Sequence, residues 1–208
     1  MSFTKLIERN LCYLLIKKNG IANLEMERIH ILNTPIDNLN MSETIDYISN
    51  AIESKKVISH VAINAAKIVS IQTDYELKES VIHADIINAD GQAIVWASKF
   101  LGQPLKERVT GVDLMEQLVK ISFEKSYKIF FLGATEEVIK NVVDFYSKKY
   151  SKDIIAGYRN GYFSRHEERE VAEETNKIQI LSDANEDFLK KGRIAFPVVI
   201  LYPYFRIA

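Results

Sequence analysis

The sequence predicts an α/β fold in which a mostly parallel sheet is flanked by helices, as in Rossmann-like proteins. Segments with strand-like and helix-like spacing of apolar residues alternate along most of the chain, and this alternation is typical of α/β proteins. Residues 128–132, KIFFL, form a continuous apolar run, which is typical of a strand buried on both faces. Polar residues follow three of the predicted strands, at the sheet edge where such folds bind ligands.

The composition is that of an ordinary globular protein with balanced charge. Of the 208 residues, 47% are hydrophobic and 26% are charged, and 27 basic residues stand against 28 acidic ones. The net charge of −1 creates no field that favours nucleic acid. Cys12 is the single cysteine, which excludes an internal disulfide and a Cys-based zinc site and fits a reducing cytoplasm.

Three parts are expected: an N-terminal helical segment over residues 1–25, an α/β domain over 26–181 and an apolar tail over 182–208. The apolar run 11–16 is too short to span a membrane and lacks a cleavage site, so we expect neither an anchor nor a signal peptide. As a helix, residues 3–18 have one broad apolar face, which suits core packing, a partner surface or a membrane interface.

Strand and helix patterns alternate before residue 84. Strands are expected over 28–32 and 57–63, a turn over 35–38, and helices over 41–55, 65–71 and 74–83. Asn40 with Glu43, and Thr73 with Glu76, have the spacing of capping boxes, which predicts that helices begin at these points.

Residues 84–113 are the segment around which the predicted site is built. A short strand over 85–89 stops at Asp90-Gly91, a pair that favours a sharp turn. A helix is expected over 92–101 and is closed by a glycine. The loop over 107–113, ERVTGVD, then brings opposite charges, a hydroxyl and a glycine together, which is unusual for a plain connector.

The second half continues the alternation. Helices are expected over 112–125, 136–149 and 165–180, strands over 128–132 and 154–155, and a turn-rich loop over 157–163. The acidic residues in the first turn of the 136–149 helix complement the helix dipole.

Three polar signals stand at predicted strand ends: Asn64, Asp90 and Gly133-Ala134-Thr135. If the strands are parallel, all three meet at one edge of the sheet, as a nucleotide-type site requires. Taken singly, Asn64 also fits a helix cap, Asp90 a turn residue and Thr135 an N-cap. The last signal lacks the lysine of a P-loop and the glycine pattern of a dinucleotide fingerprint, so it offers helix amides to a phosphate without defining a phosphate site.

Metal and hydrolase chemistry find little support. The four histidines have no metal-ligand spacing, and HExxH, CxxC and Asp-x-Asp motifs are absent from the sequence. We therefore expect no metal and no other cofactor. Serine and histidine are not grouped around a nucleophile elbow either.

Five short motifs together carry a resemblance to a known family. They are INA at 63–65, the stretch from AD to DG at 84–91, ERVTGVDL at 107–114, FLGA at 131–134 and GYRNGYF at 157–163. In this order the chain resembles the bacterial WecG/TagA/CpsF glycosyltransferases over roughly residues 29–180. The resemblance implies transfer of an N-acetylmannosamine-type sugar from a UDP donor to a polyprenyl-diphosphate-linked sugar, in teichoic acid, enterobacterial common antigen or exopolysaccharide assembly. It also implies peripheral contact with the inner face of the cell membrane.

The resemblance assigns roles to individual residues. Asp90 is implied as the general base that takes the proton of the acceptor hydroxyl, and Asn64 orients the donor or the acceptor. Arg108 suits a phosphate because its guanidinium is planar, and an ion pair with Glu107 or Asp113 is the alternative. The other implied substrate-binding residues are Gly91, Gly111, Asp113, Gly133, Thr135 and Tyr162. The family often has threonine where this chain has Ala62, which removes one hydrogen-bonding group.

The chain departs from the family pattern after residue 180, where a further strand and a basic C-terminal element are expected. The departure suggests a truncation or a frameshift, so the alternative function is a nucleotide-sugar-binding or assembly module without turnover. A dehydrogenase is disfavoured because the glycine fingerprint is absent. The oligomeric state is left open, including a homo-oligomer.

The apolar run 194–205 is uncharged and contains two prolines, Pro197 and Pro203. It is shorter than the ~20 residues of a spanning helix, and the prolines disfavour a helix or a strand in a sheet interior. We expect an extended or irregular backbone that promotes poor solubility or membrane association. The alternative is that the run packs as part of the fold.

Overall fold

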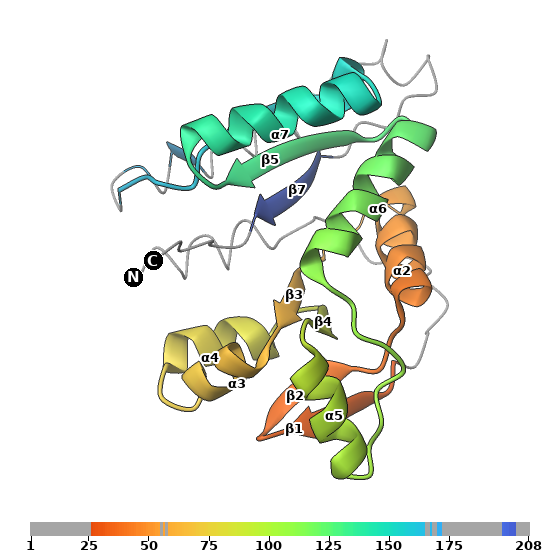
Figure 1. The fold of residues 1–208 in the computed structure, drawn as a ribbon, viewed down its shortest axis with the longest axis vertical. Coiled ribbons are helices and arrows are strands. Elements are labelled where there is room, and N and C mark those ends of the chain that lie inside the picture. The colour runs from red at the N-terminus through yellow and green to blue at the C-terminus, as the bar shows by residue number, and fades with distance from the viewer. Residues whose placement is uncertain are drawn as a thin grey trace. The chain divides into compact units, whose positions relative to one another are not determined.

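The computed structural model describes residues 26–54, 56, 58–164, 167, 170–171 and the backbone of 197–202. These residues belong to two compact units, which divide between Leu114 and Met115. Figure 1 labels their helices and strands. The segment expected to form a helix over 3–18 lies outside the described residues. So does the segment expected to form a helix over 165–180, apart from residues 167, 170 and 171. The domain boundaries expected from the sequence stay a prediction.

The first unit alternates strands and helices. Its elements are β1 (Arg28–Ile31), β2 (Thr34–Asp37), α2 (Met41–Glu53), β3 (His60–Ile63), α3 (Ala65–Ser70), α4 (Tyr75–Ile82), β4 (Ile86–Ala89) and α5 (Gln92–Phe100). Strands β3 and β4 are parallel, and His60 pairs with Ile86 while Ile63 pairs with Ala89. Both strands therefore end at the same edge of their sheet.

Strands β1 and β2 form an antiparallel hairpin, so the turn expected over 35–38 is wrong. The chain turns instead at Leu32 and Asn33, which both have positive φ, 47° and 59°, as a two-residue hairpin turn requires. Pro35 faces His30 across the hairpin. In a two-residue hairpin the pair that closes the turn, here Ile31 and Thr34, is hydrogen-bonded. The next pair, His30 and Pro35, is then a non-hydrogen-bonded pair, so the missing N–H of proline costs no hydrogen bond of the ladder.

The hairpin is joined to β4 by side chains. The Asp37 carboxylate accepts a hydrogen bond of 2.7 Å from the Ile87 backbone N–H and lies 2.6 Å from Arg28 Nε. Arg28 also donates to the Ala84 carbonyl. Because Asp37 takes the N–H that a neighbouring strand would use, β1 and β2 form a sheet of their own. Isoleucines of three strands, Ile36, Ile63 and Ile87, are fully buried around this junction.

Polar caps fix where the helices begin. Asn40 caps α2 through a complete capping box with Glu43, and this confirms the prediction. Asn64 caps α3 by accepting from Lys67 N at 2.9 Å. Helix α4 is capped by Asp74, which accepts from Leu77 N, so the predicted capping role of Thr73 is wrong. The Thr73 hydroxyl instead donates to the Ser70 carbonyl.

The second unit is built around a three-stranded parallel sheet. Its elements are most of α6 (Gly111–Glu124), β5 (Lys128–Gly133), α7 (Glu136–Lys149), the 3-10 helix η1 (Lys152–Ile154), β6 (Ile155–Arg159) and β7 (Pro197–Tyr202). Strand β5 lies between β6 and β7, and its apolar residues 129–132 are buried as expected. Residues 157–159 extend β6, so the predicted loop over 157–163 begins three residues too early.

The C-terminal run contains a strand. Pro197–Tyr202 pairs in parallel with Lys128–Gly133 at one edge of the three-stranded sheet. Proline begins this strand, which is one of the positions that sheets tolerate. The expected extended backbone is confirmed for these residues, and the pairing favours the alternative in which the tail is part of the fold. The described fold is mixed α/β with short parallel sheets, which confirms the predicted class.

Candidate functional site

Asn64 and Asp90 lie side by side just beyond the ends of β3 and β4. The last paired residues of the two strands are Ile63 and Ala89, and the Asp90 N–H donates to the Ile63 carbonyl at 2.7 Å. Gly91, the N-cap of α5, also lies close by, because a Cβ on Gly91 would be 3.8 Å from Asn64 Cβ. The structure thus brings together these three predicted site residues.

The Asp90 carboxylate lies next to two residues with little or no side chain. A Cβ on Gly111 would lie 3.8 Å from Asp90 Oδ2 and 3.7 Å from Ala62 Cβ, so a glycine and an alanine border the carboxylate. Asp90 is half-buried, and among the described residues no side chain pairs with its carboxylate. A carboxylate without an internal partner at a ligand-binding edge is available to accept a proton.

Asn64 has both a structural and a free polar group. Its Oδ1 caps α3, so the structural alternative is confirmed. Its Nδ2 group has no hydrogen-bond acceptor in the part of the chain that the structure describes, and the residue is exposed. The amide oxygen can therefore cap the helix while the amide nitrogen contacts a ligand.

The segment after α5 returns along that helix to the strand ends. Gln103 N donates to the Ser98 carbonyl, and Val109 N donates to the Ala89 carbonyl at 3.0 Å. Leu105 N donates to the buried Ser98 hydroxyl. These contacts bring Arg108 and Gly111 beside the end of β4.

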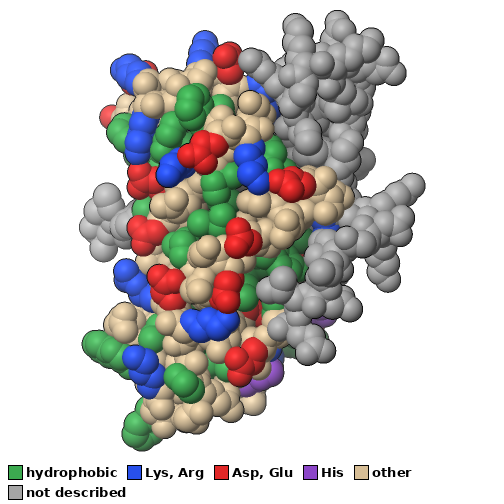
Figure 2. Space-filling model, turned by 90° about the vertical axis from the view of Figure 1, so that its right-hand side faces the viewer, with side chains coloured by type: hydrophobic (Ala, Val, Ile, Leu, Met, Phe, Trp, Pro, Cys, Tyr) green, Lys and Arg blue, Asp and Glu red, His purple; other side chains and the backbone are tan. Residues whose placement is uncertain are grey.

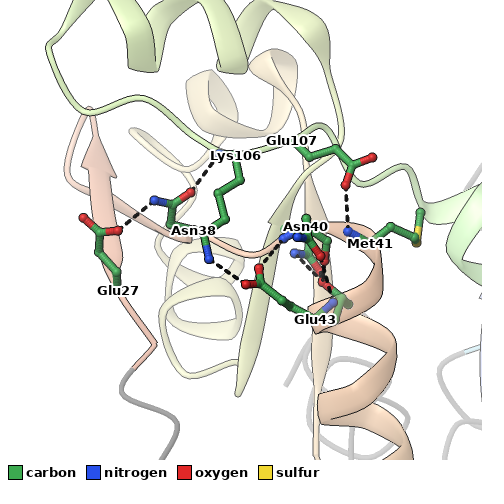
Figure 3. Close-up of polar contacts among 9 residues, drawn as sticks. Glu27, Asn38, Asn40, Met41, Glu43, Lys106 and Glu107 are labelled. Carbon is green, nitrogen blue, oxygen red and sulfur yellow. Dashed lines mark hydrogen bonds and ion pairs between the residues drawn. The ribbon is translucent and has the colours of Figure 1, made fainter.

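A polar clamp, defined here as Asn38, Met41, Glu43, Lys106 and Glu107, holds this segment against the start of α2 (Figure 3). Asn38 Oδ1 accepts from Lys106 N at 2.8 Å, and Lys106 Nζ lies 2.7 Å from Glu43 Oε1. The hydrogen bond from Lys106, with a further one from the Asn40 backbone, lowers the pKa of Glu43. Glu107 Oε2 accepts from Met41 N at 2.9 Å. Neither Asn38 nor Lys106 stands in a sequence pattern that predicts a site role.

Arg108 is exposed. It forms no ion pair with any described residue, so the predicted alternative of pairing with Glu107 or Asp113 is not observed. Glu107 binds the Met41 amide, and Asp113 accepts from the Thr110 hydroxyl. The Thr110 hydroxyl also caps α6 by accepting from Asp113 N. Thr110 is therefore the residue that caps the helix, the Asp113 carboxylate binds its hydroxyl, and contact of Asp113 with a substrate stays a prediction.

A second cluster of predicted residues lies at the carboxyl end of β5, in the second unit. A Cβ on Gly161 would lie 2.9 Å from Gly133 Cα, so the two backbones touch. Gly133 has a φ of 138°, which glycine tolerates. Thr135 caps α7, as the structural alternative predicted, and Tyr162 is exposed. The convergence of this cluster with Asn64 and Asp90 stays a prediction.

The charge at this second cluster disfavours phosphate. Glu136 and Glu137 occupy the first turn of α7, where they already complement the helix dipole. A hydrogen bond from Asn160, together with Lys140, lowers the pKa of Glu136, so this residue is ionised at neutral pH. The cluster suits neutral hydroxyl or amide groups better than a phosphate.

A polar network of the partly buried His60 and the buried Asn88 and Thr44 lies on β3, β4 and α2 and was not predicted. His60 Nε2 lies 2.9 Å from Asn88 Oδ1, and because an amide oxygen only accepts, the imidazole donates. Asn88 Nδ2 donates to the Thr44 hydroxyl. Desolvation lowers the pKa of His60 to about 4. Asn88 precedes Asp90 by two residues, and this spacing places both on one strand face. It was the one sequence signal from which a polar role of Asn88 near Asp90 could have been predicted.

The described residues include no group of three or more His, Cys, Asp or Glu side chains arranged to hold a metal ion. None of the helices in the described ranges is long and apolar enough to cross a membrane. Figure 2 shows Lys and Arg side chains interspersed with Asp and Glu on the face that it draws.

A carboxylate and an amide at the carboxyl edge of a parallel sheet define the ligand-binding edge of an α/β protein. The chain belongs to the Glycosyl transferase WecG/TagA/CpsF family, whose model matches residues 29–180.

Curated relatives are described as N-acetylglucosaminyldiphosphoundecaprenol N-acetyl-beta-D-mannosaminyltransferases. The protein of Bacillus subtilis strain 168 is 29% identical over 140 residues, which cover 67% of this chain and 54% of the relative. The protein of Bacillus spizizenii is 36% identical over 56% of this chain and 48% of the relative. The protein of Staphylococcus aureus strain NCTC 8325 is 30% identical over 69% of this chain and 57% of the relative. The matched part of the chain thus spans about half the length of these relatives.

Proposed function

We propose that this chain acts in a glycosyltransferase that moves an N-acetylmannosamine-type sugar from a UDP donor to a polyprenyl-diphosphate-linked sugar. The observation that carries the proposal is the unpartnered Asp90 carboxylate, bordered by Gly111 and Ala62 at the sheet edge. The names of the relatives support the sugar and the acceptor. The proposed setting is cell-wall polymer or exopolysaccharide assembly at the inner face of the membrane.

In the proposed reaction the acceptor hydroxyl oxygen attacks the anomeric carbon of the donor sugar. A new carbon–oxygen bond forms, the bond from that carbon to the UDP oxygen breaks, and the configuration inverts. Asp90 accepts the hydroxyl proton, and UDP leaves with the bonding electrons. General-base catalysis of this kind contributes roughly 10²–10⁴-fold to the rate.

Neighbouring residues take supporting roles in the proposal. The free Nδ2 group of Asn64 donates to the donor or the acceptor, and the backbone at Gly91 and Gly111 allows close approach of the sugar. Arg108 compensates the charge that develops on the leaving diphosphate, which a guanidinium matches in geometry. In the second unit, Gly133, Thr135 and Tyr162 contact the neutral uracil or sugar groups, and Asp113 is a further substrate-binding residue.

A direct assay tests the proposal. The protein is incubated with UDP-N-acetylmannosamine and a lipid-linked N-acetylglucosaminyl diphosphate, and both the released UDP and the disaccharide product are followed. We expect product and UDP in equal amounts. Calorimetric titration with the donor runs in parallel, and donor binding without transfer would favour a nucleotide-sugar-binding module. Failure to bind the donor would contradict both functions.

A further inference from the structure

Helix α5 exposes an apolar surface that the described part of the chain does not cover. Its inner face is buried through Ile94, Val95 and Ser98. On the outside, Trp96 is 65% exposed, Phe100 is 92% exposed and Leu101, which follows the helix, is 55% exposed. These three outer residues are named the α5 patch. A helix that is apolar on both sides normally has a partner on each side.

We propose that the α5 patch docks onto the lipid bilayer surface and holds the Asp90 site next to the headgroups. The inference rests on the proposed function in one respect, since an undecaprenol-linked acceptor, as named for the relatives, is held in a membrane. Aromatic side chains on the outer face of a helix, flanked by a lysine, are typical of helices that lie in the membrane interface. Lys99 is exposed and forms no ion pair with the described residues.

The size of the patch favours lipid over a second copy of the chain. A large aromatic side chain offers ~150–250 Å² of surface, so the α5 patch offers roughly 400 Å². Each partner in a stable protein complex contributes about 800 Å². Insertion of two aromatic rings into a bilayer surface needs no such complementary area.

The position of the helix links docking to the site. Helix α5 begins at Gln92, directly after Asp90 and Gly91, and the rise of about 1.5 Å per residue puts Trp96 about 6 Å along the helix from its first residue. A bilayer that holds the α5 patch therefore holds the carboxylate close to the level at which an acceptor diphosphate lies.

Trp96 is the single tryptophan of the chain and reports on its own surroundings. The full chain is mixed with vesicles of phosphatidylcholine and phosphatidylglycerol, with and without brominated lipid. We expect the Trp96 emission to shift to shorter wavelength and to be quenched by the brominated lipid. An unchanged and unquenched spectrum would overturn the proposal. Emission that is already blue-shifted without lipid would also overturn it, because it would show that the chain itself covers Trp96. A blue shift on raising the protein concentration alone would overturn it as well, because it would show that a second copy of the chain covers the α5 patch.

A matched pair of variants locates the contact. Phe100→Gln with Leu101→Gln keeps the tryptophan reporter and is expected to lower vesicle affinity by at least about tenfold. Val69→Gln with Tyr75→Gln, at residues 65% and 71% exposed in the same unit, is expected to bind vesicles like the parent. Equal vesicle binding by the α5 variant, with an unchanged melting temperature, contradicts the proposal.

Transfer rates with a soluble and with a membrane-embedded acceptor distinguish lipid docking by the α5 patch from the proposed transferase activity. With an N-acetylglucosaminyl diphosphate on a short, water-soluble alkyl chain, the α5 variant is expected to match the parent. With the acceptor embedded in vesicles, the variant is expected to be slower. If the parent does not use the soluble acceptor, the proposed function fails, while the Trp96 spectrum still decides whether the α5 patch binds lipid.

Discussion

At the scale of single residues, Gly111 controls the space beside Asp90. A methyl group at this position would lie 3.8 Å from Asp90 Oδ2, an ordinary contact that the fold accommodates but that occupies the place proposed for the acceptor hydroxyl. Gly111→Ala is expected to lower the transfer rate by roughly ten- to a hundredfold without loss of stability. Initial rates and thermal melts of the same preparation measure both quantities.

Gly102 provides the opposite control. It has a φ of +73°, and a Cβ there would meet nothing within 4 Å. Gly102→Ala is therefore expected to cost about 1–2 kcal/mol of unfolding free energy through backbone strain and to leave the transfer rate unchanged. Equal rate losses in the two variants would show that Gly111 acts through stability.

His60 makes stability depend on pH. Its pKa is lowered to about 4, chiefly by desolvation, whereas an unfolded histidine titrates near 6.5. Between these values the unfolded state binds the extra proton, so the free energy of unfolding falls as pH falls from about 6.5 to about 4, by up to roughly 3 kcal/mol. Urea unfolding across this range measures the slope.

His60→Gln retains a donor for Asn88 and removes the titration, so this slope should flatten. His83→Gln, at an exposed histidine at the end of α4, should keep the parent slope. A His60 variant that loses stability with the same slope would contradict the assignment.

At the scale of elements, two contacts of the polar clamp differ in burial and should differ in effect. Asn38 is 8% exposed, accepts from the Lys106 backbone and donates to Glu27, so Asn38→Ala removes both hydrogen bonds and is expected to cost about 1–3 kcal/mol. The Lys106–Glu43 ion pair is solvent-exposed, so Lys106→Gln is expected to cost less than about 1 kcal/mol. Chemical denaturation compares the variants.

The clamp should also affect turnover, because it fixes the segment that carries Arg108 and Gly111. Asn38→Ala is expected to lower transfer more than Lys106→Gln does. If Asn38→Ala loses stability while its rate at a temperature well below melting stays at the parent value, the clamp does not position the site.

The sequence predicted the elements with strong local signals. The Asn40 capping box, the apolar strand β5 and the helix that follows Gly91 are each determined by residues within a few positions of one another. It did not predict the β1–β2 turn, because Leu32 and Asn33 are not a typical turn pair. The Asp37 contact with Ile87 and the clamp join residues 50 and more positions apart, and one sequence contains no pattern that pairs them.

The candidate site was predicted in the same way. Asn64, Asp90 and Gly91 follow strands, and the parallel pairing of β3 and β4 is sufficient to bring them together. The contact of Gly111 with Asp90 depends on the return of the chain along α5, which local patterns do not show. The His60 network depends on which face of β3 and β4 packs against α2, which the short strands leave undetermined.

At the scale of the whole molecule, the C-terminal strand has a structural role. Strand β7 pairs along the full length of β5, whose apolar side chains are buried. Removal of residues 192–208 exposes that edge to water, so we expect a lower melting temperature and aggregation. Size-exclusion chromatography and thermal melts of both forms measure this. A truncated form that is monodisperse and equally stable would instead support the tail as a solubility liability.

The most direct test of the account is Asp90→Asn, which keeps the size of the side chain and removes its ability to accept a proton. The comparison is made with Asp46→Asn, at an exposed aspartate of α2, in a transfer assay with UDP-N-acetylmannosamine. We expect Asp90→Asn to reduce turnover by about 10²–10⁴-fold, with donor affinity and melting temperature unchanged, while Asp46→Asn matches the parent. Turnover by Asp90→Asn within a few-fold of the parent would contradict the assignment of Asp90 as the general base.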